Sequence, residues 1–108
     1  VFAIVLIIAI ITALNVEQFS RLGAVLLIAV ILHNTSGLLI AYFSARFMGY
    51  KTPECRTLAI EVGMQNSGLA VALAIKHFSA AAALPGAVFS IWHNLSGSAL
   101  AFFWSKKP

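Results

Sequence analysis

The sequence predicts an all-α membrane protein, and three observations carry that prediction. Of the 108 residues, 61% are apolar and only 9% are charged, and the mean hydropathy is +0.97. Soluble domains rarely combine these values. The apolar residues also gather into long runs with short polar stretches between them. We therefore expect about four transmembrane helices, the first of them truncated.

The apolar runs cover residues 1–14, 22–48, 58–75 and 80–104. Crossing about 30 Å of hydrocarbon takes roughly 20 residues, so the second and fourth runs are long enough. The chain opens inside the first run without an initiator Met, and we expect a truncated helix rather than a signal peptide. The predicted connections are residues 15–21, residues 49–56 with Pro53 at a helix entry, and a tight turn near residues 77–80.

The net charge of +4 comes from basic residues at the ends of the apolar runs, which argues against a nucleic-acid partner. Arg21 and Lys76 flank one side of the expected topology. The other side has five basic residues, namely Arg46, Lys51, Arg56, Lys106 and Lys107. The positive-inside rule then predicts a cytoplasmic C-terminus. We expect a multi-pass protein of the bacterial inner (plasma) membrane.

The third run contains an unusual polar sequence, Glu-Val-Gly-Met-Gln-Asn-Ser-Gly, at residues 61–68. A lipid-facing helix would not tolerate this sequence, and Asn66 would lie about 15 Å from either boundary, near the midplane. An unpaired carboxylate at that depth costs about 2.5–3.5 kcal/mol, so Glu61 needs a cation, a proton or water. A structural alternative stays open, in which Glu61 pairs with a base or a polar neighbour on a missing helix, and Gln65 and Asn66 form hydrogen bonds between helices.

Spacing and glycines suggest how this segment could bind an ion. Thr57, Glu61 and Gln65 would share one helix face, while Gly63 and Gly68 would permit the helix to unwind. A broken transmembrane helix is a common device of transporters, because free carbonyls and acidic oxygens bind a small cation there. We therefore expect the third helix to be broken at the midplane.

A second pattern, His-Asn-x-Ser-Gly, occurs at residues 33–37 and again at residues 93–97. His93 and Asn94 could donate hydrogen bonds to a carboxylate or a sulfonate, and a packing role for them is the alternative. For His33 and Asn34 we favour a role in helix packing.

Motifs typical of enzymes are absent from the sequence. It has no Walker loop, His-Glu-x-x-His, Gly-x-Ser-x-Gly or paired-cysteine motif, and Cys55 is the only cysteine. Ser90 and His93 could suggest an intramembrane hydrolase, but no local motif marks them as nucleophile and base. We predict that the chain is not an enzyme.

The sequence resembles the bile acid:sodium symporter family. The resemblance rests on residues 54–57, on Glu-Val-Gly-Met-Gln-Asn-Ser-Gly-Leu-Ala at residues 61–70, on Leu84-Pro85-Gly86 and on Trp92-His93-Asn94. It implies a fold of ten transmembrane helices in two inverted repeats, with a panel domain and a core domain. Residues 1–14 would be the end of a panel helix, and residues 21–104 would be three core helices of the second repeat.

The resemblance also implies roles for single residues. Glu61 and Gln65 would bind sodium through side-chain oxygens, and Val62 and Met64 would bind it through backbone carbonyls. The residues that would face the substrate are Asn66, His93 and Asn94. Further sodium ligands would lie on N-terminal helices absent from this chain.

These observations predict a fragment of a sodium-coupled symporter that carries small organic anions across a lipid bilayer by alternating access. Bile-acid-like anions, pantoate and other carboxylates fit the family equally, and nothing in the residues chooses among them. Sodium would be the co-transported ion. The alternative is a membrane-embedded structural or interaction fragment that does not transport.

Overall fold

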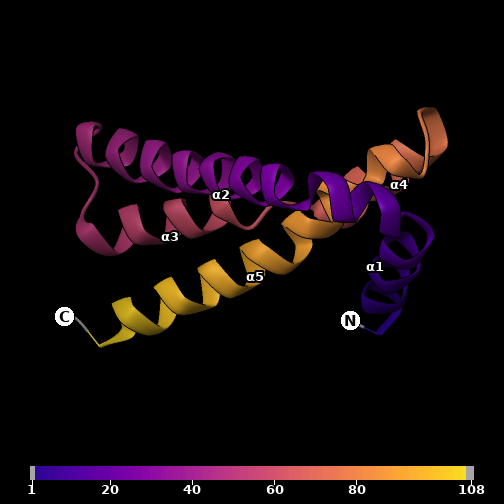
Figure 1. Ribbon diagram of the computed structural model, residues 1–108. Coiled ribbons are helices and arrows are strands. Elements are labelled where there is room, and N and C mark those ends of the chain that lie inside the picture. Colours follow the sequence, from indigo (N-terminus) through magenta and orange to yellow (C-terminus); the bar gives the residue numbers. More distant parts are fainter. Residues whose placement is uncertain (1, 107–108) are drawn as a thin grey trace. The chain divides into compact units, whose positions relative to one another are not determined.

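All regular elements of the described chain are helices. The structure, a computed structural model, describes residues 2–106 except for the side chain of Ile4. The elements are α1 (Phe2–Leu14), α2 (Val16–Phe47), α3 (Thr52–Gly63), α4 (Ser67–His77), the short 3₁₀ helix η1 (Ala81–Ala83) and α5 (Leu84–Ser105) (Figure 1). The prediction of an all-α protein is confirmed over this range.

Two of the expected membrane spans meet both the length and the hydropathy that a bilayer requires. They are α2 and the stretch Thr52–His77, which contains α3 and α4. Helix α1 is shorter, and α5, with 22 residues, does not reach the hydropathy that the other two stretches reach over a membrane-spanning length. The structure therefore supports the membrane prediction through its second and third spans.

The expected connection over residues 15–21 is wrong, because α2 already begins at Val16. Only Asn15 separates α1 from α2, and its Nδ2 donates to the carbonyl of Ile11 at 2.9 Å. The polar residues that follow are exposed, and Glu17 lies in the first turn, where a negative charge favours the helix. A polar stretch thus continues a helix here instead of ending it.

A glycine ends α2. Gly49 adopts φ 88°, a left-handed conformation that favours glycine. The N–H of Gly49 donates to the carbonyl of Arg46 at 3.1 Å, and the N–H of Tyr50 donates to the carbonyl of Ala45 at 3.1 Å. These two hydrogen bonds form a Schellman motif, which satisfies carbonyls at the helix end.

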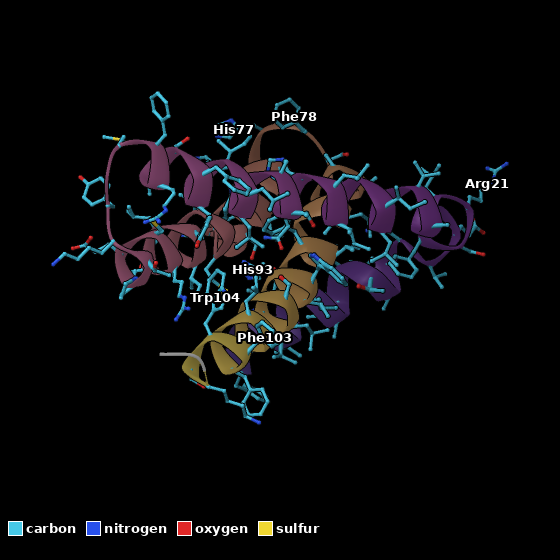
Figure 2. The ribbon with its side chains drawn as sticks, turned by 90° about the vertical axis from the view of Figure 1, so that its left-hand side faces the viewer. Arg21, His77, Phe78, His93, Phe103 and Trp104 are labelled. Atoms are coloured by element: carbon cyan, nitrogen blue, oxygen red, sulfur yellow. The ribbon has the colours of Figure 1, made fainter. Side chains whose placement is uncertain are left out.

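The start of α3 and the turn after α4 agree with the sequence predictions. Pro53 lies in the first turn of α3, and the Glu54 carboxylate accepts a hydrogen bond from the N–H of Lys51 at 2.7 Å. After α4 the chain turns at Phe78, whose N–H donates to the carbonyl of Ala74 at 3.0 Å. The Phe78 side chain is exposed and projects away from this turn (Figure 2).

The chain divides into two compact units, and each unit combines two segments that are distant in the sequence. The first unit contains residues 1–30 and 66–91. Its core joins α1, α4, η1 and α5 through Ile11, Val71, Ala83, Leu84 and Ala87. Gly86 allows α5 to approach α4 closely, since a Cβ at this position would lie 2.9 Å from Val71 Cγ2.

The second unit contains residues 31–65 and 92–106. Within it, α3 runs back alongside the second half of α2, and the second half of α5 runs in the same direction as α2 (Figure 1). Tyr42 of α2 stacks on Trp104 of α5, with ring centroids 6.1 Å apart and planes inclined by 28°. This aromatic contact joins the ends of the two helices.

Candidate functional site

The helix that the sequence predicts to be broken is broken in the structure. Helix α3 ends at Gly63 and α4 begins at Ser67, so residues 64–66 interrupt the apolar stretch Thr52–His77. The two parts have 12 and 11 residues, which places the break near the middle of the stretch. The polar residues of the third apolar run therefore lie at a change of backbone conformation.

The break does not need glycine's conformational freedom. Met64 has φ −89° and ψ 75°, and Asn66 has φ −79° and ψ 72°. These angles are close to those of an inverse γ-turn, which any L-residue adopts. Among the described residues only Gly49 has a positive φ, so the expectation that Gly63 and Gly68 unwind this helix through their backbone freedom is wrong.

Gly63 instead allows close packing. A Cβ at this position would lie 2.5 Å from Leu38 Cδ2 and 3.7 Å from Asn34 Nδ2. The end of α3 therefore approaches α2 more closely than a larger residue would permit. Gly68 has no such neighbour, because its nearest heavy atom is Asn66 Oδ1 at 3.8 Å.

Hydrogen bonds fix both ends of the break. The N–H of Met64 donates to the carbonyl of Ile60 at 2.8 Å, and the Gly63 carbonyl accepts from Asn34 Nδ2 at 2.9 Å. On the other side, Asn66 Oδ1 caps α4 by accepting from the N–H of Leu69 at 3.0 Å. Each end of the break thus has its own specific hydrogen-bond partners.

Several carbonyls at the break stay available. A helix end leaves its last carbonyls without an intrahelical N–H partner. Within residues 2–106, the carbonyls of Glu61, Val62, Met64 and Gln65 receive no backbone or side-chain hydrogen bond. Two of these four, on Val62 and Met64, are the carbonyls that the resemblance implies for sodium.

Glu61 and Gln65 both lie at the break and both are exposed. Glu61 is in the last turn of α3, on the same helix as Thr57, whereas Gln65 lies beyond the helix end. The expected alignment of all three residues on one helix face is therefore wrong, because the helix stops before Gln65. Within the described chain no three His, Cys, Asp or Glu side chains come together, so the oxygen donors here are one carboxylate, amides and carbonyls. Such a donor set suits a hard monovalent cation.

The residues expected to face the substrate belong to different units. Asn66 lies in the first unit, whereas His93 and Asn94 lie in the second. His93 is buried on α5 (Figure 2), whereas Asn94 and Asn66 are exposed. The Asn66 side chain also caps α4. A shared role of these three residues in binding a substrate stays a prediction.

Sequence reasoning assigned Asn34 only a packing role and missed its position at the break. Asn34 is buried in α2, with Nδ2 on the Gly63 carbonyl and Oδ1 accepting from Ser96 Oγ of α5 at 2.8 Å. It thereby connects the first His-Asn-x-Ser-Gly pattern with the second. The repetition of that pattern was the one signal that could have indicated this contact.

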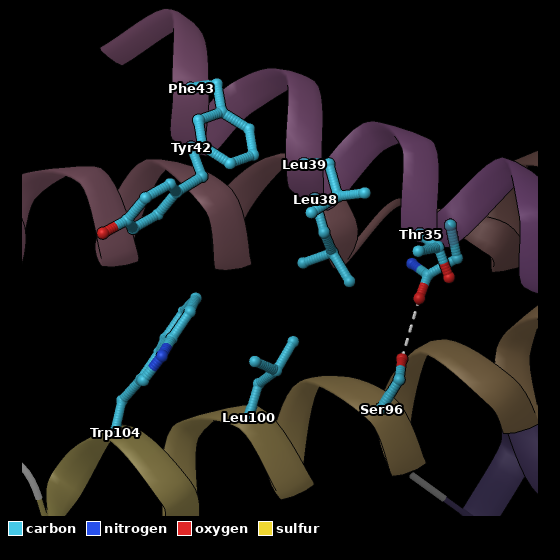
Figure 3. Close-up of a pocket in the computed structure, with 9 residues that line it drawn as sticks. Thr35, Leu38, Leu39, Tyr42, Phe43, Ser96, Leu100 and Trp104 are labelled. Carbon is cyan, nitrogen blue, oxygen red and sulfur yellow. Dashed lines mark hydrogen bonds between the residues drawn. The ribbon is translucent and has the colours of Figure 1, made fainter. Parts of the chain in front are cut away.

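The bond between Asn34 and Ser96 lies at one end of a mostly apolar pocket of about 440 Å³ (Figure 3). Leu38 and Leu100 face each other across the pocket, and the stacked pair Tyr42 and Trp104 closes its other end. The polar contact is therefore bordered by apolar side chains within this unit.

Comparison with known proteins gives several relatives, although no protein-family model matches the chain. The chain is 48% identical over 107 residues to the uncharacterized sodium-dependent transporter YocS of Bacillus subtilis, covering 99% of this chain and 33% of that protein. It is 40% identical over 93 residues to the probable sodium/metabolite cotransporter BASS1 of Arabidopsis thaliana, covering 85% of this chain and 23% of that protein. A probable sodium/metabolite cotransporter of rice, BASS2, is 36% identical over 92 residues, covering 84% of this chain and 22% of that protein.

The chain therefore spans about a third of the length of the Bacillus subtilis protein and about a quarter of the plant proteins. The matched segment lies in their C-terminal part, and all three are sodium-dependent transporters or sodium/metabolite cotransporters. This chain is thus a relative of the bile acid:sodium symporters and corresponds to the C-terminal part of the proteins it matches.

Proposed function

We propose that the chain is the C-terminal segment of a sodium-coupled symporter for small organic anions, and that sodium binds at the break between α3 and α4. The observation that carries this proposal is the end of α3. Two carbonyls without hydrogen-bond partners, on Val62 and Met64, lie next in sequence to a carboxylate and an amide, on Glu61 and Gln65. Unwound backbone beside an acid is a recurring cation site in transporters.

Sodium would act first by neutralising Glu61. A bare carboxylate in the bilayer costs about 2.5–3.5 kcal/mol, and a bound cation removes most of that cost. Sodium would also hold the carbonyls of Val62 and Met64 in one arrangement. Binding of the ion would therefore order the break and make the site electrostatically ready for an anion.

The anion would bind on the other side of the break. Asn66 uses its Oδ1 to cap α4, which leaves its Nδ2 group as a donor. The N-terminus of α4 carries the partial positive charge that attracts anions. This helix end would bind the carboxylate of the anion, and sodium at Glu61 would favour that binding by neutralising a negative charge close to Asn66 in sequence. A role of His93 and Asn94 in binding the same anion follows from the resemblance alone.

Transport itself would require the rest of the protein. In the proposed arrangement residues 1–14 end a panel helix and residues 21–104 form core helices, and the missing N-terminal helices supply the opposing surface and the other sodium ligands. Alternating access would then move the core against the panel. The segment without those helices would hold only part of the site.

The test uses the full-length transporter that carries this segment, called here the parent transporter. It would be reconstituted in liposomes under an inward sodium gradient, and uptake of bile-acid-like anions, pantoate and other carboxylates would be measured. We expect sodium-driven accumulation, and we expect Glu61→Ala to abolish it because the variant lacks the carboxylate that binds the ion. Gln65→Ala should raise the sodium concentration needed for half-maximal uptake.

Glu17→Ala is the matched control, since it removes an exposed acid far from the break in sequence. We expect this variant to transport as the unmodified protein does. Normal sodium dependence in a well-expressed Glu61→Ala variant would show that the proposed ion site is wrong. A parent transporter that accumulates no anion above empty liposomes would instead favour the structural alternative.

A further inference from the structure

Asn34 connects three helix segments of the second unit at the level of the break. Its side chain is only 3% exposed. It contacts the last residue of α3 through Nδ2 and the second half of α5 through Oδ1, at 2.9 Å and 2.8 Å respectively. Moving this buried amide would cost free energy, because each hydrogen bond that it loses to the other two helices leaves a buried polar group without a partner.

Chemistry alone fixes the orientation of this amide. The Gly63 carbonyl can only accept a hydrogen bond, so the NH₂ group of Asn34 must face it. The oxygen of Asn34 therefore faces Ser96, whose hydroxyl must be the donor. The alternative flip would place two acceptors against each other.

The bond to Gly63 immobilises one peptide group of the break. The carbonyl of Gly63 and the N–H of Met64 belong to the same planar peptide. Asn34 holds its carbonyl at 2.9 Å, and the carbonyl of Ile60 holds its N–H at 2.8 Å. This plane is thus anchored at both edges, whereas the two neighbouring peptides carry the carbonyls of Val62 and Met64 without such partners.

We propose that Asn34 is a positioning residue for the ion site: it anchors the peptide between Gly63 and Met64, and thereby aims the carbonyls of Val62 and Met64 at a cation. This inference rests on the proposed function, because it assigns a purpose to the geometry of that same site. Asn34 itself does not bind the ion. The hydrogen bond from Asn34 to the Gly63 carbonyl also prevents this carbonyl from binding the ion.

Ser96 acts through Asn34. Its hydroxyl also lies 3.3 Å from the carbonyl of His93 on its own helix, a longer and weaker alternative to the bond at 2.8 Å. Ser36 holds the equivalent place in the first His-Asn-x-Ser-Gly pattern, is exposed, and donates to the carbonyl of His33 at 2.8 Å. Ser36→Ala is therefore a matched control for Ser96→Ala.

The experiment measures binding of radioactive sodium to the purified parent transporter in detergent, together with its thermal unfolding temperature in sodium-free buffer. We expect Asn34→Ala to raise the half-saturating sodium concentration about tenfold and Ser96→Ala about threefold, because a buried carbonyl or amide loses its partner. Ser36→Ala should leave it unchanged. In the Asn34→Ala background, Ser96→Ala should add no further change, since its effect passes through the missing amide.

The outcomes separate this inference from the proposed function. If the unmodified protein binds no sodium, or Glu61→Ala binds it normally, the proposed ion site fails. If Glu61→Ala abolishes binding while Asn34→Ala and Ser96→Ala keep the normal half-saturation, only the role of Asn34 is overturned, even where the unfolding temperature falls. If Asn34→Ala does not fold, the test is the comparison of Ser96→Ala with Ser36→Ala. Equal half-saturating sodium concentrations in these two variants would overturn the inference.

Discussion

At the scale of single residues, Gly63 shows how one amino acid can be interpreted in two ways. A glycine beside polar residues in an apolar run suggests a flexible point in a helix. The structure gives Gly63 an ordinary backbone conformation and a crowded position against Leu38. Sequence alone could not distinguish these roles, because both require the absence of a side chain and only the packing of a distant helix decides between them.

Gly63 and Gly68 should respond differently to substitution by alanine. Gly63→Ala should destabilise the parent transporter by about 1–3 kcal/mol, since the added methyl group would lie 2.5 Å from Leu38 Cδ2. Gly68→Ala, within α4 and with no atom closer than 3.8 Å, should be neutral or stabilise by up to about 1 kcal/mol. Thermal unfolding of both variants checks this. Equal destabilisation by both would show that backbone freedom, not packing, is what Gly63 provides.

At the scale of helices, the sequence predicted the broken third helix for a sound physical reason. Polar groups such as Glu61 and Asn66 cost too much free energy inside a membrane-spanning helix unless they have a hydrogen-bond partner, a bound ion or water. The same reasoning failed at residues 15–21, where α2 continues through the polar side chains. Those residues lie between two apolar runs, whereas the polar residues at the break lie within one, so polarity indicated a break only inside an apolar run.

Asn66 connects the structure of α4 with its proposed function, and two substitutions separate the roles. Asn66→Ala removes the cap on the N–H of Leu69 and should cost about 0.5–2 kcal/mol of stability. Asn66→Asp keeps a capping oxygen at a helix N-terminus, so stability should be retained. Its negative charge should nevertheless raise the KM for an organic anion in the liposome assay. An Asn66→Asp variant with an unchanged KM would show that Asn66 does not face the anion.

At the scale of the whole molecule, the residues of the proposed ion site could be identified from the sequence, whereas the hydrogen bonds that support the site could not. The acid, the amide and the two carbonyls follow one another between Glu61 and Gln65, so the resemblance could mark them together. Asn34 is far from them in sequence and reaches Gly63 only because α2 and α3 pack closely. Contacts of this kind depend on tertiary structure, and no local pattern predicts their partner.

The transporters that this chain resembles are three to four times its length, so the central claim must be tested in the parent transporter. The most direct measurement is anomalous X-ray diffraction from crystals of that protein grown with thallium in place of sodium, because thallium marks a monovalent cation site by its own scattering. We expect an anomalous peak at the break, bounded by the Glu61 carboxylate and the carbonyls of Val62 and Met64. Thallium peaks elsewhere in the protein, with none at this break, would contradict it.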